Sequence, residues 1–256
     1  MLKFSHSKSN KSKFPIKVPL FVSVFKKLKL FLIVFVIFNV GLALITHIPS
    51  RINPSDAQVF REFYGFEQPT QPLNIDQQIQ LITATQHSVL NHIPFGTPIP
   101  EYSSREPEDL ILNKTGLCYD RSRTLDKFYT WLGFQSRHVY ILYLKHPVSG
   151  EPISFLRAFF TYGIESHAVT EVKTLKGWML VDSNSKWISL TRNGEPVNAD
   201  DIFRRAAEFD DLPDAFNKPY IAIRGLYSRR GHFYRPYIPY PELNWIDFLT
   251  WLFAYD

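Results

Sequence analysis

The sequence predicts an α+β domain preceded by a single N-terminal transmembrane helix. Residues 30–48 carry no full charge, and a helix of that length roughly matches the ~30 Å hydrocarbon core of a bilayer. Further along the chain, helical patterns come first and mostly non-alternating apolar strands follow. That order favours segregated helices and an antiparallel sheet over a doubly wound α/β fold.

The N-terminus combines a basic arm with the apolar segment. We expect residues 1–27 to form a cytoplasmic arm and residues 28–48 to form the membrane anchor, because lysines crowd only the N-terminal flank. A cleaved signal peptide is the alternative. The long basic region, the long apolar run and the lack of a small-residue cleavage site favour an uncleaved anchor. The remainder of the chain is then extracytoplasmic, in a periplasm-like compartment.

The charge of the chain is unevenly distributed. Residues 1–55 hold eight lysines and one arginine with no acidic residue, whereas residues 56–256 hold 20 basic and 24 acidic side chains. The basic isoelectric point therefore describes the arm rather than the folded body. Nucleic-acid binding is not expected.

Two further boundaries follow from composition. Residues 49–72 contain four prolines and are predicted to be a stalk with at most one short helix, capped by Ser55. Residues 73–256 are long enough for one globular domain with its own core. A single cysteine excludes an internal disulfide, so packing alone must stabilise the domain.

Three helices are predicted at the start of the domain. The first spans residues 74–93, with Asn74 as N-cap and Gln77 in a capping box. A short helix is predicted from Pro107 to residue 112, and a long one runs from Cys118 to residue 132 with its apolar positions on one face.

The second half of the domain is predicted to form the sheet. β-branched and aromatic residues predict strands, and residues 200–209 predict one more helix. The predicted strands are 136–144, 155–162, a hairpin of 167–172 with 178–182, 187–190 and 220–226.

Cys118 is the candidate nucleophile. A cysteine thiol titrates near pH 8.5, so little thiolate exists at neutral pH unless a helix N-terminus or an imidazolium favours it. Cys118 lies where the helix begins, just after Gly116, and its backbone N–H would point toward an oxyanion.

His167 and Asp182 are the candidate base and orienting acid. A hairpin symmetric about residues 174–175 would place residues 167 and 182 opposite each other on one face, with Cβ atoms about 4.5–5.5 Å apart. Asp182 would then accept a hydrogen bond from one imidazole nitrogen while the other nitrogen faces the thiol. A register slip of one residue would separate them.

Five motifs between residues 75 and 190 belong together: Gly116-Leu-Cys118, Trp-Leu-Gly133-Phe, Arg137-His-Val, Ser-His167-Ala-Val-Thr-Glu-Val and Gly177-Trp-Met-Leu-Val-Asp182. With these motifs, residues 75–190 resemble the transglutaminase-like family, which has a papain-type cysteine-enzyme fold. One departure is Val169, where many members carry tryptophan.

The resemblance implies a nucleophile helix packed on an antiparallel sheet, with Cys118, His167 and Asp182 as catalytic triad. We expect attack on an amide carbonyl of a peptide-like or cell-envelope substrate through a thioester, followed by hydrolysis or acyl transfer. No cofactor and no metal site are expected. The alternative is an inactive module of the same fold that binds cell-envelope peptide or glycan.

The C-terminal segment is rich in aromatic residues, with ten between positions 226 and 256. We expect them to complete the core. One alternative is an interfacial helix over residues 243–255 that lies on the membrane. A second is a platform for sugars or extended peptides, which rests on composition alone.

Overall fold

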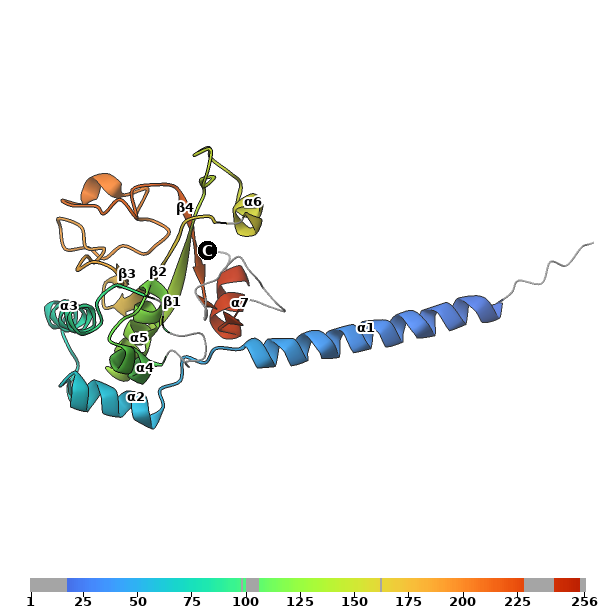
Figure 1. The fold of residues 1–256 in the computed structure, drawn as a ribbon, viewed down its shortest axis with the longest axis horizontal. Helices are drawn as coiled ribbons and strands as arrows, with labels where there is room; N and C mark the ends of the chain where they lie inside the picture. Colours follow the sequence, from blue (N-terminus) through green and yellow to red (C-terminus); the bar gives the residue numbers. More distant parts are fainter. Residues whose placement is uncertain (1–17, 98, 100–105, 162, 228–241, 254–256) are drawn as a thin grey trace, which may run out of the picture. The chain divides into compact units, whose positions relative to one another are not determined.

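The computed structural model describes residues 18–97, 99, 106–161, 163–227 and 242–253. It combines helices with an antiparallel sheet and divides into two units, residues 1–44 and 45–256. Figure 1 shows the order of the elements along the chain.

The described part of the N-terminal unit belongs to the apolar helix α1, Val18–Thr46, whose last two residues are counted in the second unit. Within α1, residues Val24–Ile45 have a mean hydropathy of 2.6 and none of that window is buried against the protein. The one amide in the span, Asn39, donates a hydrogen bond to the carbonyl of Phe35 at 2.7 Å, so its polarity is satisfied inside the helix. The helix is long and apolar enough to cross a membrane, close to the predicted bounds.

The predicted stalk, residues 49–72, is wrong, since much of it is folded into the C-terminal unit. Helix α2, Pro54–Gln58, continues directly into a turn of π-helix, Val59–Phe63. Phe60 is fully buried and stacks on Phe128 with ring centroids 4.2 Å apart. Prolines suggested an extended linker, but burial of aromatic side chains favours the folded arrangement.

The predicted helices at the start of the domain are present. Helix α3, Ile75–His92, begins with the capping box of Asn74 and Gln77. Helix α4 spans Pro107–Asn113, and helix α5 spans Cys118–Trp131.

A four-stranded antiparallel sheet forms the centre of the domain. Its order is β3-β2-β1-β4, and α5 packs against β1 and β2 (Figure 1). The strands are β1, Ser136–Tyr143; β2, Ser166–Thr174; β3, Gly177–Val181; and β4, Tyr220–Arg224.

Both faces of the sheet are buried. Val139 and Ile141 pack into one cluster with residues that follow β3, whereas Tyr140 and Leu142 pack into a cluster with the C-terminal helix. Burial on both faces explains why the strands lack alternation of polar and apolar residues.

Three predicted elements differ in the structure: the strands 155–162 and 187–190, and the helix 200–209. Residues 155–162, predicted as a strand, contain helix α6, Phe155–Phe160, because Phe155 and Ala158 pack as one helical face against the sheet. Residues 187–190, predicted as a strand, form only isolated bridges.

Residues 200–209, predicted as a helix, form turns and one short 3₁₀ segment, Ala206–Glu208. The side-chain oxygen of Asn198 accepts hydrogen bonds from the backbone N–H groups of Asp200 and Asp201. Such local bonds compete with helix formation.

The C-terminal helix α7, Trp245–Phe253, follows a two-stranded sheet of β5, Leu226–Tyr227, and β6, Glu242–Leu243. Gly225 has φ +70°, and a Cβ there would lie 2.7 Å from the carbonyl oxygen of Asn244. The close approach of α7 therefore requires glycine.

The aromatic residues of the tail divide between core and surface. Trp245, Phe248 and Trp251 pack against the cluster around Leu142, as expected for residues that complete the core, whereas Phe253 is exposed. Tyr227 of β5 is also buried. The other five tail aromatics lie outside the described residues: Phe233, Tyr234, Tyr237, Tyr240 and Tyr255.

Candidate functional site

Cys118 is the first residue of α5. The preceding residue, Leu117, has the extended backbone of an N-cap, and its N–H donates to a carboxylate oxygen of Asp120 at 2.9 Å. Gly116 lies so close to its surroundings that a Cβ would be 3.3 Å from the side chain of Ile93. The thiol is partly exposed, at a helix end that favours negative charge.

His167 and Asp182 are in direct contact. The Nε2 atom of His167 and the Oδ1 atom of Asp182 are 2.7 Å apart, and both residues are buried. Cys118 lies near enough to His167 to raise the pKa of the imidazole. The fold thus brings together all three residues that the sequence predicted as a site.

The predicted hairpin register is wrong by two residues. Thr174 pairs with Gly177, so the turn lies at residues 175–176, and Asp182 is displaced by two positions from the place opposite His167. Because side chains repeat every two residues along a strand, a shift of two keeps both residues on one face. The diagonal neighbours remain within reach of an imidazole ring.

The carboxylate of Asp182 is held by the loop that follows it. The backbone N–H of Asn184 donates to Oδ1 at 3.0 Å, while the backbone N–H and hydroxyl of Ser185 donate to Oδ2. Burial raises the pKa of Asp182, but the hydrogen bond from His167 and these further donors outweigh it and hold the pKa below its ordinary value. Asp182 is therefore a carboxylate at neutral pH.

The imidazole of His167 is held in its charged form. Burial lowers its pKa, but the hydrogen bonds and charges of Asp182 and Cys118 outweigh burial and raise the pKa to about 9. At neutral pH the ring is therefore held as an imidazolium beside the carboxylate of Asp182.

Another buried histidine, His138, has different hydrogen-bond partners from His167 and the opposite shift in pKa. Its Nδ1 lies 2.9 Å from the hydroxyl of Ser122, and its ring stacks on Tyr227 with centroids 4.1 Å apart. Burial, together with the charge of Arg123, lowers the pKa of His138 to about 3. It stays neutral and serves packing rather than proton transfer.

Sequence reasoning missed Gln86, which positions the acid. Its side-chain amide donates to the carbonyl oxygens of Asp182, Ser185 and Trp187 at 2.8–2.9 Å. Gln86 lies between Ile82 and Val89 on the buried face of α3, and a polar residue at a core position was the signal available in the sequence.

Arg121 is the second residue that sequence reasoning missed. Its guanidinium donates to the carbonyl of Ser183 at 2.8 Å and lies 5.4 Å from the ring centre of Phe95. Burial lowers the pKa of Arg121, although the charges of Cys118 and Asp182 oppose that effect. Arg121 thus links the helix of the thiol with the loop after Asp182.

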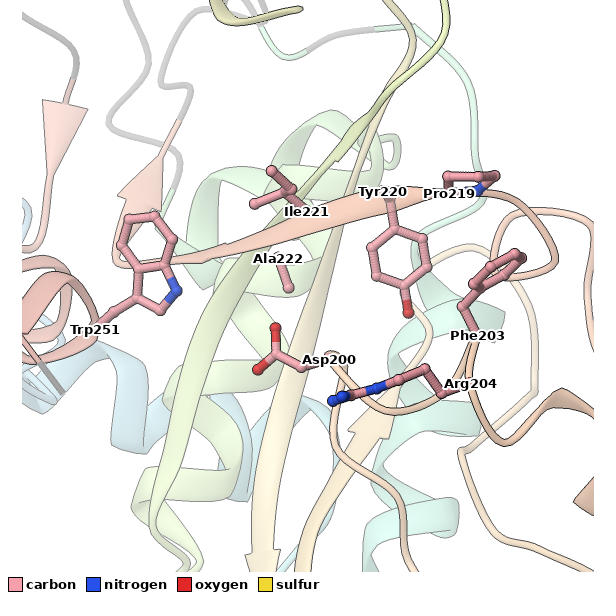
Figure 2. Close-up of a pocket in the computed structure, with 8 residues that line it drawn as sticks. All are labelled: Asp200, Phe203, Arg204, Pro219, Tyr220, Ile221, Ala222 and Trp251. Carbon is pink, nitrogen blue, oxygen red and sulfur yellow. The ribbon is translucent and has the colours of Figure 1, made fainter. Parts of the chain in front are cut away.

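A hollow of about 420 Å³ lies elsewhere, at β4 and α7, and none of the three site residues lines it (Figure 2). Its charged residues are already paired, since Asp200 binds Arg224 at 2.7 Å and Arg204 binds Asp201. Among the described residues, no group of three or more His, Cys, Asp or Glu side chains is placed to hold a metal ion.

No protein-family model matches the sequence, and no curated protein matches it either. The chemistry of Cys118, His167 and Asp182 is therefore the basis for assigning a function.

Proposed function

We propose that this protein is a membrane-anchored, extracytoplasmic cysteine enzyme of transglutaminase-like type that attacks an amide carbonyl of a peptide-like substrate. The observation that carries the proposal is the buried hydrogen bond between His167 and Asp182, with Cys118 at the start of α5 near enough to raise the pKa of the imidazole. A structural thiol requires neither a charged imidazole nor a carboxylate behind it. A module that only binds its ligand has no need of them either.

The reaction begins with attack of the Cys118 thiolate on the carbonyl carbon. The backbone N–H of Cys118 stabilises the oxyanion, and the imidazolium of His167 donates its proton to the leaving amine as the C–N bond breaks. The product of this half-reaction is a thioester on Cys118 and a neutral imidazole. Asp182 keeps the ring oriented throughout.

A second nucleophile completes the cycle. Water or an amine attacks the thioester carbonyl while neutral His167 accepts its proton, and the C–S bond breaks to release an acid or a new amide. The sulfur leaves as thiolate and the imidazolium is restored. Hydrolysis is favoured for a domain surrounded by bulk water, and transfer is favoured where amines are concentrated.

The transglutaminase-like assignment is supported by the arrangement of the elements. The thiol begins a helix that packs on the central strands, the histidine lies on β2, and the acid follows β3 of the same antiparallel sheet. This is the arrangement that the resemblance implies for Cys118, His167 and Asp182.

The extracytoplasmic location rests on two features of the N-terminus. Helix α1 is long and apolar enough to span a membrane, and all eight lysines of this region lie before residue 30, where its uncharged stretch begins. Positive flanking charge is retained in the cytoplasm. We therefore assign residues 45–256 to the far side, with cell-envelope peptides as the substrate class.

An acyl-transfer probe tests the proposal. Full-length protein in detergent is incubated with p-nitrophenyl acetate, and intact mass and peptide mapping locate the acetyl group. We expect a single hydroxylamine-sensitive thioester on Cys118 and catalytic release of nitrophenol, both absent in Cys118→Ala. Acetylation restricted to lysines, or a thioester that never turns over, would contradict the proposal and favour the inactive binding module.

A further inference from the structure

Helix α7 presents apolar side chains on the side that faces away from the core. Trp245, Phe248 and Trp251 pack inward, and Figure 2 shows Trp251 beside Ile221 and Ala222 of β4. The outer side carries four large apolar residues with exposed fractions of 43–72%: Ile246, Leu249, Leu252 and Phe253. An apolar surface of this kind normally has a partner.

The chain itself limits where this surface lies. The apolar span ends at Ile45, and the backbone N–H of Ile48 donates to the carbonyl of Leu243 at 2.9 Å. The side chain of Asn244 donates to the hydroxyl of Ser50 at 2.6 Å. Three residues of chain reach at most about 10 Å. The start of α7 is therefore tied close to the point where the span ends.

The size of α7 limits the choice of partner. At about 1.5 Å per residue, nine residues are too short to cross a ~30 Å hydrocarbon layer, so α7 does not span the membrane. Four exposed side chains are also far fewer than the roughly 20–30 residues per side of a standard protein interface. A second copy of the chain is thus a poorer fit than a lipid surface.

We propose that the exposed face of α7 lies in the lipid interface of the membrane from which α1 emerges. Apolar and tryptophan-containing helices of low charge bind at this depth. Together with α1, the helix would fix the domain at two points and so restrict its rotation over the membrane. The inference depends on the membrane span and not on the chemistry of Cys118.

Depth-dependent fluorescence quenching tests this inference in the full chain. Because Cys118 is the only native cysteine, a Cys118→Ser background allows one label at a time. The environment-sensitive fluorophore NBD is attached to Leu249→Cys, with Phe35→Cys as the membrane control and Glu195→Cys as the solvent control, in proteoliposomes with and without brominated phosphatidylcholine. Glu195 is exposed on the loop beside β3, at the opposite edge of the sheet from β4.

We expect the label at Leu249→Cys to be blue-shifted and quenched by brominated lipid, as at Phe35→Cys, while the label at Glu195→Cys is not quenched. Quenching at Phe35→Cys alone would overturn the interfacial helix and leave the anchor intact. Quenching at neither position would overturn both. Concentration-dependent energy transfer between copies labelled at Leu249→Cys, without lipid quenching, would identify a second copy as the partner and also overturn the proposal.

Discussion

Replacing His167 by alanine is expected to lower the turnover of p-nitrophenyl acetate at pH 7 by about 10²- to 10⁴-fold. The variant loses the proton donor for the leaving group and the imidazolium beside the sulfur. Cys118→Ser is expected to reduce turnover to background, because a serine hydroxyl lacks the readily ionised sulfur. Initial rates of nitrophenol release measure both effects.

A second histidine, His146, provides the control. His146 lies in the loop after β1 and accepts hydrogen bonds from backbone N–H groups of residues 148 and 149, so His146→Ala should leave the rate unchanged. Circular dichroism and melting temperature establish that each variant is folded, and Cys118→Ser should melt close to wild type. A folded His167→Ala variant with a rate within tenfold of wild type would exclude His167 as the base.

Replacing Lys127 by methionine is expected to lower the free energy of unfolding by about 3–5 kcal/mol. The Lys127 ammonium is buried and binds Asp56 at 2.6 Å, and it also binds Glu106. Loss of the ammonium leaves the carboxylate of Asp56, which is 1% exposed, without its counter-charge. Urea unfolding followed by tryptophan fluorescence measures the change.

A surface pair supplies the matched control. Lys176 and Glu195 are also an ion pair, at 2.8 Å, but their side chains are 41% and 49% exposed, so Lys176→Met should cost less than about 1 kcal/mol. The double variant Lys127→Met with Asp56→Leu should recover part of the loss, since no buried charge then lacks a partner. If Lys127→Met and Lys176→Met lowered the free energy of unfolding equally, the buried ion pair would not stabilise the packing of α2 on α5.

The sequence predicted the places of the three candidate residues in the fold better than it predicted several of the elements around them. Cys118 could be placed because a glycine and a helical period define the start of α5. His167 and Asp182 could be placed on one face because strands repeat every two residues, which made a register error of two harmless. A local pattern with a fixed period was sufficient to place Cys118 at the start of the helix and to place His167 and Asp182 on one face of the sheet.

The missed features depend on tertiary contacts. Nothing local in residues 54–63 indicates that Phe60 will stack on Phe128 or that Asp56 will bind Lys127. Local sequence does not predict the helix at Phe155–Phe160 either, because its packing against the sheet is what stabilises a helix there instead of a strand. Gln86 reaches the acid only because α3 and the loop after β3 meet in space.

The rate of Cys118 alkylation as a function of pH tests the central claim most directly. Full-length protein is reacted with iodoacetamide between pH 5.5 and 9.5, and modification is followed by intact mass. An ordinary thiol gains about tenfold in rate per pH unit below about 8.5. Asp182 and Cys118 raise the pKa of His167 to about 9 despite its burial, and the proposed mechanism requires this imidazolium to stabilise a thiolate.

We therefore expect wild-type Cys118 to react well below pH 8, with a rate that changes little between pH 6 and 8. In His167→Ala the rate at pH 6 should fall sharply and the profile should become that of an ordinary thiol. A wild-type profile that already matches a free thiol, or an unchanged profile in His167→Ala, would contradict the account.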